Sequence, residues 1–202
     1  YKAGVDFADY NIDIKGKMNV PADLVRRRWL DNNFYGQITA LSYVDSLNDL
    51  TIGGGWSVYN GLHFGTLPYL SQTFAPANFR YYDNDAIKKE RNSYVKWERK
   101  LTKQFKSFID LQYRYVSHQM NGFTKNTNLE IERKFNFFNP KMGLTYQAKN
   151  IFYYTSVAVA NKEPNRDDFE ASATEQPRRE QLIDWETGFE FKRPKYAINA
   201  NV

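Results

Sequence analysis

The chain of 202 residues contains no cysteine, which excludes a disulfide framework, a thiolate metal site and a cysteine nucleophile. It also lacks any long apolar run, and this excludes a helical membrane span, which needs about 18 consecutive apolar residues. Histidine is scarce, and His63 and His118 lie far apart in the sequence without a zinc-like or calcium-like spacing of His, Asp and Glu around them. The sequence therefore predicts no metal site and no bound cofactor.

An excess of charge of one sign is also missing. The net charge is +5, from 28 Lys and Arg against 23 Asp and Glu. The basic residues are interleaved with acids, as in residues 96–100 (KWERK), and such mixing is typical of a solvated strand face rather than a phosphate track. We therefore expect no nucleic-acid partner.

Aromatic residues are abundant for so polar a chain, with 15 Tyr, 15 Phe and 4 Trp. An ordinary soluble core does not need so many amphipathic rings. β-Barrels bounded by aromatic girdles use them, and so do surfaces that stack on sugars or bases.

The hydrophobic pattern repeats every two residues along most of the chain. One stretch, Pro21–Arg28, has the signals of a short helix, with Pro21 in its first turn. Strands are predicted over residues 34–44, 50–60, 93–101, 107–118, 140–148, 150–160, 180–192 and from 196 onward. In 107–118, for example, one face carries Ile109, Leu111, Tyr113 and Tyr115, and the other carries Asp110, Gln112, Arg114 and His118.

The connections alternate in length. Tight turns are predicted at 45–49, 102–106, 148–150 and 193–195, and long polar loops at 61–92, 119–139 and 161–179. Short turns on one side and long loops on the other are typical of an outer-membrane barrel. A soluble sandwich would alternate as well, but the charged polar faces and the aromatic ends of the apolar faces favour the barrel. The expected fold is all-β, a segment of about eight strands of an antiparallel up-and-down transmembrane β-barrel.

Several strings resemble TonB-dependent outer-membrane receptors, especially those of the Bacteroidetes type. They are RRWLDNNFYG (27–36), YNGLHFG (59–65), YYDN (81–84), DLQYR (110–114), FNPKMGLTY (138–146), NKEPNRDDF (161–169) and the strand around WETGFE (185–190). The resemblance runs from about Arg26 to Val202, with the strings in the family's order.

This resemblance implies a plugged, roughly 22-stranded barrel in the outer membrane of a Gram-negative bacterium. It implies TonB-energised uptake of a scarce nutrient: an iron–siderophore, haem, cobalamin or a glycan. The implied partners are outer-membrane lipid, the plug domain of the same polypeptide, TonB and a small-molecule or glycan ligand. The chain carries no TonB box, plug domain or final aromatic strand, and it stops inside an alternating run. Residues 1–202 are thus expected to be a fragment of one barrel domain, forming wall and extracellular loops.

Candidate ligand-binding residues lie in the predicted extracellular loops. The aromatic ones could stack on sugars, aromatic chelators or haem; they are Tyr69, Phe74, Phe79, Tyr81 and Tyr82. His63 could contact haem, as the resemblance implies, or serve as a structural histidine. Arg166 could bind ligand, or pair with lumenal acids in a structural turn in which Asn165 and Asp167 bond nearby backbone.

Catalysis is not expected. Residues 117–122 (SHQMNG) resemble the catalytic strand of outer-membrane phospholipase A, but Met120 stands where the nucleophilic serine is needed. The alternative to a transport role is a soluble β-rich glycan-binding module that uses the same exposed aromatics.

Overall fold

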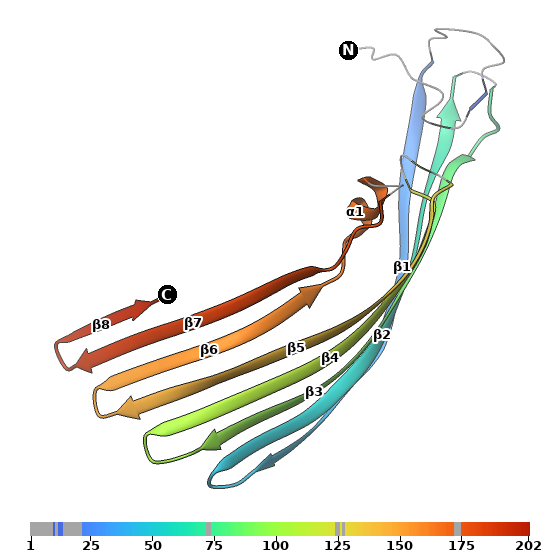
Figure 1. Cartoon of the computed structure of the whole chain (residues 1–202). Helices are drawn as coiled ribbons and strands as arrows, with labels where there is room; N and C mark the ends of the chain where they lie inside the picture. The colour runs from blue at the N-terminus through green and yellow to red at the C-terminus, as the bar shows by residue number, and fades with distance from the viewer. Residues whose placement is uncertain are drawn as a thin grey trace. The chain divides into compact units, whose positions relative to one another are not determined.

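In a computed structural model of the chain, eight antiparallel strands form one sheet in which each strand pairs with the next along the sequence (Figure 1). The structure describes residues 10, 12–13, 22–71, 74–123, 126, 128–171 and 175–202. The strands are β1 (Leu24–Val44), β2 (Asn48–Leu70), β3 (Phe79–Lys100), β4 (Phe105–Asn121), β5 (Glu130–Ala148), β6 (Ile151–Lys162), β7 (Glu180–Arg193) and β8 (Tyr196–Asn201); helix α1 (Arg166–Ala171) lies between β6 and β7. The predicted all-β, up-and-down antiparallel fold is confirmed.

The four tight turns also lie where they were predicted. In the β1–β2 turn, Asp45 Oδ1 accepts the backbone N–H groups of Leu47 and Asn48, both at 2.7 Å. These bonds lower the pKa of Asp45 from 3.8 to about 2, because they stabilise its charged form. In the β3–β4 turn, the Thr102 hydroxyl accepts the N–H of Phe105 at 3.1 Å. Short polar side chains therefore replace the hydrogen bonds that the strands lose where they reverse.

The strands are longer than the alternation predicted. β2 has 23 residues and β3 has 22, so most of the predicted loop 61–92 is strand, and only residues 71–78 connect the two. Likewise, most of the predicted loop 119–139 belongs to β4 and β5. Strands are held together by backbone hydrogen bonds, which polar side chains do not interrupt. The strands therefore continue beyond the positions where the hydrophobic alternation stops. The third predicted loop, 161–179, is largely a connection and contains α1.

The helix predicted over Pro21–Arg28 is wrong for its described part. Pro21 lies outside the described residues, and β1 begins at Leu24 and continues through the three arginines. Pairing with β2 outweighed the weak local helix signal. Among the residues that the structure describes, no helix has the length and apolar character needed to cross a membrane.

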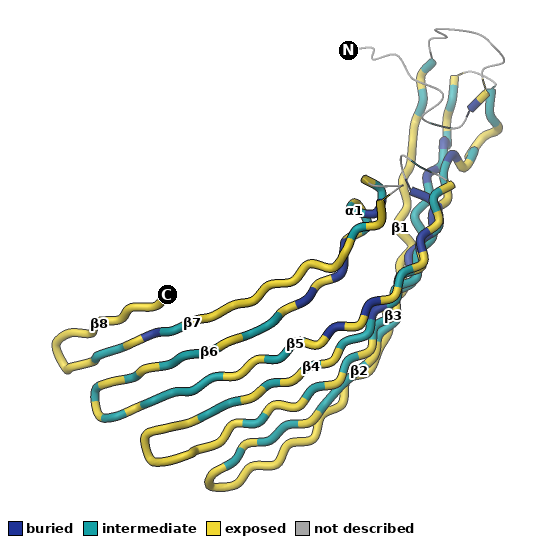
Figure 2. The backbone as a smooth tube through the Cα atoms, viewed as in Figure 1, coloured by how far each residue is buried: buried dark blue, intermediate teal, exposed yellow. Residues whose placement is uncertain are grey.

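The chain divides into two compact units. The first comprises Tyr1–Tyr35, Val58–Lys88 and His118–Arg133, and the second comprises Gly36–Ser57, Lys89–Ser117 and Lys134–Val202. The first unit contains a buried cluster of Ile12, Leu67 and Tyr81. In the second unit most strand residues are exposed or half-buried, as the tube coloured by burial shows (Figure 2). That unit presents a sheet with two accessible faces.

Candidate functional site

The two faces of the sheet in the second unit differ in chemistry. Met142 on β5 lies opposite Val157 on β6, and Val157 lies opposite Trp185 on β7. Because side chains alternate along a strand, the same face also carries Leu144, Tyr146, Ile151, Tyr153, Ile183, Phe189 and Phe191. The opposite face of these strands carries Lys141, Thr145, Gln147, Ser156, Asp184, Glu186 and Glu190. One face is therefore apolar and the other polar across three adjacent strands.

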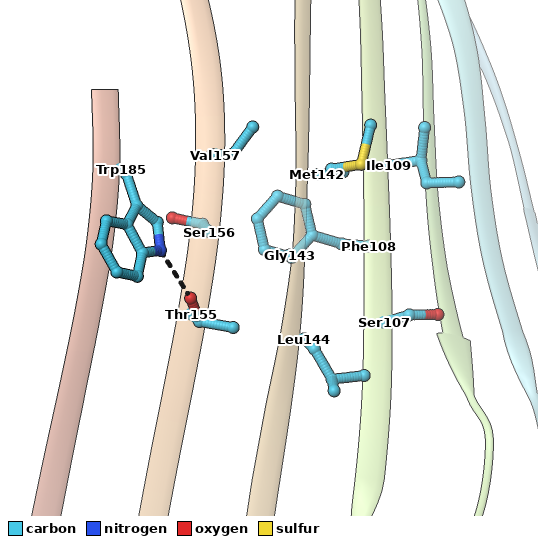
Figure 3. A pocket seen from close by; sticks show the side chains of 10 residues that line it. All are labelled: Ser107, Phe108, Ile109, Met142, Gly143, Leu144, Thr155, Ser156, Val157 and Trp185. Atoms are coloured by element: carbon cyan, nitrogen blue, oxygen red, sulfur yellow. Dashed lines mark hydrogen bonds between the residues drawn. The ribbon is translucent and has the colours of Figure 1, made fainter. Parts of the chain in front are cut away.

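The apolar face is exposed. Trp185 and Ile183 retain 70% and 69% of their accessible surface. Part of this face forms a hollow of about 410 Å³ between β4 and β7, to which Ile109, Met142 and Leu144 contribute. The Trp185 indole N–H donates to the Thr155 hydroxyl at 3.1 Å (Figure 3), so the polar tip of the ring is satisfied within the face. None of the ten described residues that line the hollow is charged. The surface thus suits an apolar environment.

Aromatic rings on the polar face lie over glycines of the neighbouring strand. Tyr154 is the cross-strand partner of Gly188, and a Cβ at Gly188 would lie 2.7 Å from Cζ of that ring. A Cβ at Gly143 would lie 2.5 Å from the Phe108 ring. Glycine at these positions lets the rings lie flat on the backbone, as in the aromatic rescue of strand glycines. Part of the aromatic content therefore serves the polar face.

A half-buried ion-pair network lies on this polar face, at Arg114 of β4. Its guanidinium bonds Glu90 of β3 through Nε and Nη2, both at 2.8 Å. It also bonds Glu163, just after β6, through Nη1 at 2.7 Å and Nη2 at 3.0 Å. The guanidinium carbon lies 5.9 Å from the ring centroid of the buried Phe137. Two bidentate carboxylates hold one guanidinium in a single orientation, which is the strongest geometry for such a pair.

A second chain of hydrogen bonds crosses β4 to β7 beside Pro140. Gln112 accepts from the Asn139 amide at 3.1 Å, and Asn139 Oδ1 accepts both the backbone N–H and the side-chain amide of Asn161 at 3.0 Å. Asn161 Oδ1 in turn accepts from Gln181 at 3.0 Å. Pro140 has no backbone N–H, so β5 lacks one donor for the backbone hydrogen bonds between strands at this position. The side-chain amides form hydrogen bonds between the strands beside it. Amide side chains thus join four strands.

Four of the predicted ligand-binding residues come together in the first unit. Phe74, Phe79 and Tyr82 pack against the cluster that contains Tyr81. Tyr81 is only 6% exposed, and its ring makes edge contacts with Tyr10 at 5.0 Å and with Tyr82 at 4.9 Å between centroids. Burial raises the pKa of Tyr82. The geometry shows that these rings pack against one another.

The other three predicted residues are not members of that cluster. Tyr69 and His63 both belong to β2, and Tyr69 is 54% exposed while His63 is half-buried. Arg166 belongs to the second unit, where it opens α1.

The turn before α1 is capped by its own side chains. Asn165 Oδ1 accepts the N–H of Asp167 at 2.8 Å and that of Asp168 at 3.1 Å, and the Asp168 carboxylate accepts the N–H of Asn165 at 2.8 Å. This reciprocal pattern is a capping box. The structural interpretation is confirmed for Asn165, whereas Asp168, rather than Asp167, supplies the second cap.

Sequence reasoning missed one aromatic surface. Trp29 of β1 and Phe64 of β2 stack with centroids 6.0 Å apart and planes at 14°, and Arg80 of β3 lies over Phe64 at 3.8 Å. The available signal was the alternation Arg27-x-Trp29, which places a cation and a ring on one side of a strand. Among the described residues, no group of three or more His, Cys, Asp or Glu side chains could hold a metal ion.

Comparison with known proteins gives a fold likeness. No family model matches the chain, and no curated protein matches it. A solved structure, that of the ferric citrate transporter FecA in its unliganded form, is similar with a TM-score of 0.56 and 12% sequence identity. The similarity covers 82% of this chain and 26% of the transporter, so the chain spans about a quarter of that protein's length. At this identity the likeness concerns the fold.

Proposed function

We propose that the chain is part of the wall of a TonB-dependent receptor barrel in the outer membrane of a Gram-negative bacterium. The observation that carries this proposal is the two-faced sheet, apolar on one side and polar on the other across β5, β6 and β7. Strings in the sequence that resemble the Bacteroidetes-type receptors support it, and so does the fold likeness to the FecA transporter.

The apolar face fits lipid because burying it is favourable. Each Å² of apolar surface removed from water contributes roughly 25 cal/mol, and Trp185 and Ile183 are largely exposed in the chain as it stands. Monomeric soluble proteins rarely expose contiguous apolar patches larger than a few hundred Å². Outer-membrane barrels bury such a face in the bilayer and keep charged residues toward the lumen.

The proposed partners follow from these faces. Outer-membrane lipid would cover the apolar face, and a plug domain of the same polypeptide would fill the lumen beside the polar face. Uptake would be energised through TonB, and the cargo would be an iron–siderophore, haem, cobalamin or a glycan. We propose a transport role and no enzymatic one.

Uptake can be tested in cells that carry the intact gene. Disruption of the gene should abolish accumulation of at least one radiolabelled cargo among ferric chelates, haem, cobalamin and oligosaccharides, and loss of TonB should have the same effect. Complementation with the intact gene is the control. Unchanged accumulation of all four classes would contradict the transport proposal, and a chain that stays monomeric in water without detergent would favour the soluble glycan-binding module.

A further inference from the structure

A row of two stacked rings with a cation at each end crosses three strands of the first unit. Arg27 and Trp29 lie on one side of β1, with the Arg27 guanidinium carbon 5.8 Å from the centroid of the indole. Trp29 stacks on Phe64 of β2, and Arg80 of β3 lies over Phe64. We call these four residues the arginine–aromatic ladder. Its two rings are near-parallel and a guanidinium stands at each end.

The ladder is open to solvent. Trp29 is 45% exposed, and the Arg80 side chain is 42% exposed. A guanidinium that lies against a ring keeps its N–H donors at its edge, where they can bind an anion in the plane of the group. One N–H of the Arg80 guanidinium donates to the Asp83 carboxylate at 2.7 Å. This ion pair is exposed and contributes little stability. Within the described part of the chain, Arg27 has a ring contact but no ion pair.

The second unit offers a matched pair for comparison. Arg99 lies 5.7 Å from the Trp97 ring, two residues away on the same strand, with the geometry of Arg27 and Trp29. The Trp97 indole N–H donates to Asn48 at 3.2 Å, and no described ring is stacked on Trp97. A lone arginine–tryptophan pair is thus an ordinary feature of these strands. Two cations that bracket a two-ring stack distinguish the ladder.

The position of the ladder along β1 indicates what it meets. A barrel strand needs about 9–11 residues to cross a membrane. Counted from the β1–β2 turn, β1 reaches that length near Tyr35, and Trp29 lies about six residues farther along the strand. If the barrel wall is as proposed above, the ladder lies beyond the hydrocarbon by about 20 Å measured along the tilted strand, at the level of headgroups and the sugars attached to them. The occupant expected there combines anionic groups with sugar rings.

We propose that the arginine–aromatic ladder binds a phosphorylated, lipid-anchored saccharide of the outer leaflet. The edges of Arg27 and Arg80 take up phosphate oxygens in charge-assisted hydrogen bonds, and the exposed part of Trp29 contacts a sugar ring. Asp83 competes with the phosphate for Arg80. The inference rests on the proposed membrane location but not on any transported cargo.

The test uses the 202-residue chain in detergent micelles, titrated calorimetrically with lipopolysaccharide. The double variant Arg27→Ala/Arg80→Ala should bind at least tenfold more weakly, and Asp83→Asn should bind severalfold more tightly. The matched control, Arg99→Ala/Arg193→Ala, removes two ring-stacked arginines of the second unit and should bind within twofold of the parent chain. Unchanged circular dichroism checks that each variant keeps its sheet.

Two further arms identify the ligand. The parent chain and the double variant should bind dephosphorylated lipopolysaccharide with equal affinity. If the free phosphorylated core oligosaccharide binds as tightly as the intact molecule, the lipid anchor is not needed and the assignment is overturned. Equal losses in the double variant and in its control would overturn it as well. A chain that inserts in bilayers but fails this titration refutes the ladder and leaves the proposed barrel wall intact.

Discussion

At the scale of single residues, Arg114 is the side chain whose loss should cost most stability. It neutralises Glu90 and Glu163, and the Glu163 side chain is only 8% exposed. Replacing Arg114 with Met removes the guanidinium that both carboxylates share. We expect Arg114→Met to lower the free energy of unfolding in detergent by about 2 kcal/mol, since hydrogen bonds to charged, half-buried groups each contribute about 1.5–3 kcal/mol and the carboxylates regain part of their hydration.

An exposed pair on the same face provides the control for Arg114. Lys96 and Asp110 approach to 3.9 Å, with the Lys96 side chain 59% exposed, and Lys96→Met should cost less than about 1 kcal/mol. If urea titrations give the same loss of unfolding free energy for both substitutions, the partial burial of the Arg114 network does not contribute to stability.

The Arg114 network also shows what sequence alone cannot supply. The alternation correctly put Asp110, Gln112 and Arg114 on one polar face. Glu90 and Glu163, the partners of Arg114, lie 24 and 49 positions away in the sequence. They can be identified only from the register between strands, which the alternation of polar and apolar residues does not encode. Trp29, Phe64 and Arg80 were missed for the same reason, because each comes from a different strand.

At the scale of the strand pair, a ring over a glycine couples β6 to β7. A methyl group at Gly188 would collide with the Tyr154 ring. We expect Gly188→Ala to cost about 1–3 kcal/mol through overpacking. In the background of Tyr154→Ala the same change should cost at least about 1 kcal/mol less, because neighbouring side chains couple. A double-mutant cycle in denaturant measures this, and strictly additive effects would refute the contact.

The β1–β2 turn should respond to acid. The pKa of Asp45 is lowered to about 2, so its carboxylate stabilises the turn above about pH 4, and this contribution is lost as the pH falls through about 2. NMR shifts of the Leu47 and Asn48 amides, which donate to Asp45, should titrate with a midpoint near pH 2. Asp45→Asn should abolish that titration. A midpoint near 3.8 would mean that the bonds are absent in solution.

Turns and strand ends differed in how far they could be predicted. Asp45 and Thr102 carry short polar side chains that cap turns locally, so composition alone located both turns. The outer ends of β2 and β3 continue through polar stretches such as Tyr81–Asn84, where only pairing with a neighbour keeps the chain extended. The short helix predicted before Trp29 failed because β1 pairs with β2 there.

At the scale of the whole molecule, the abundant aromatics have three uses. Some lie on the apolar face, such as Trp185, others cover glycines on the polar face, such as Tyr154, and a third set packs in the cluster around Tyr81. Face assignment from alternation predicted the first use. The other two depend on cross-strand neighbours and on chain packing that no local pattern reports.

The most direct test of the account is the environment of two adjacent positions on β6. The chain has no cysteine, so Val157→Cys and Ser156→Cys can each carry one fluorescent label after reconstitution in bilayers. Val157 faces the side of Trp185, and Ser156 faces the side of Glu186. We predict that lipid-attached nitroxide quenches the label at 157, whereas aqueous iodide quenches the label at 156. Equal iodide quenching at both positions would contradict it.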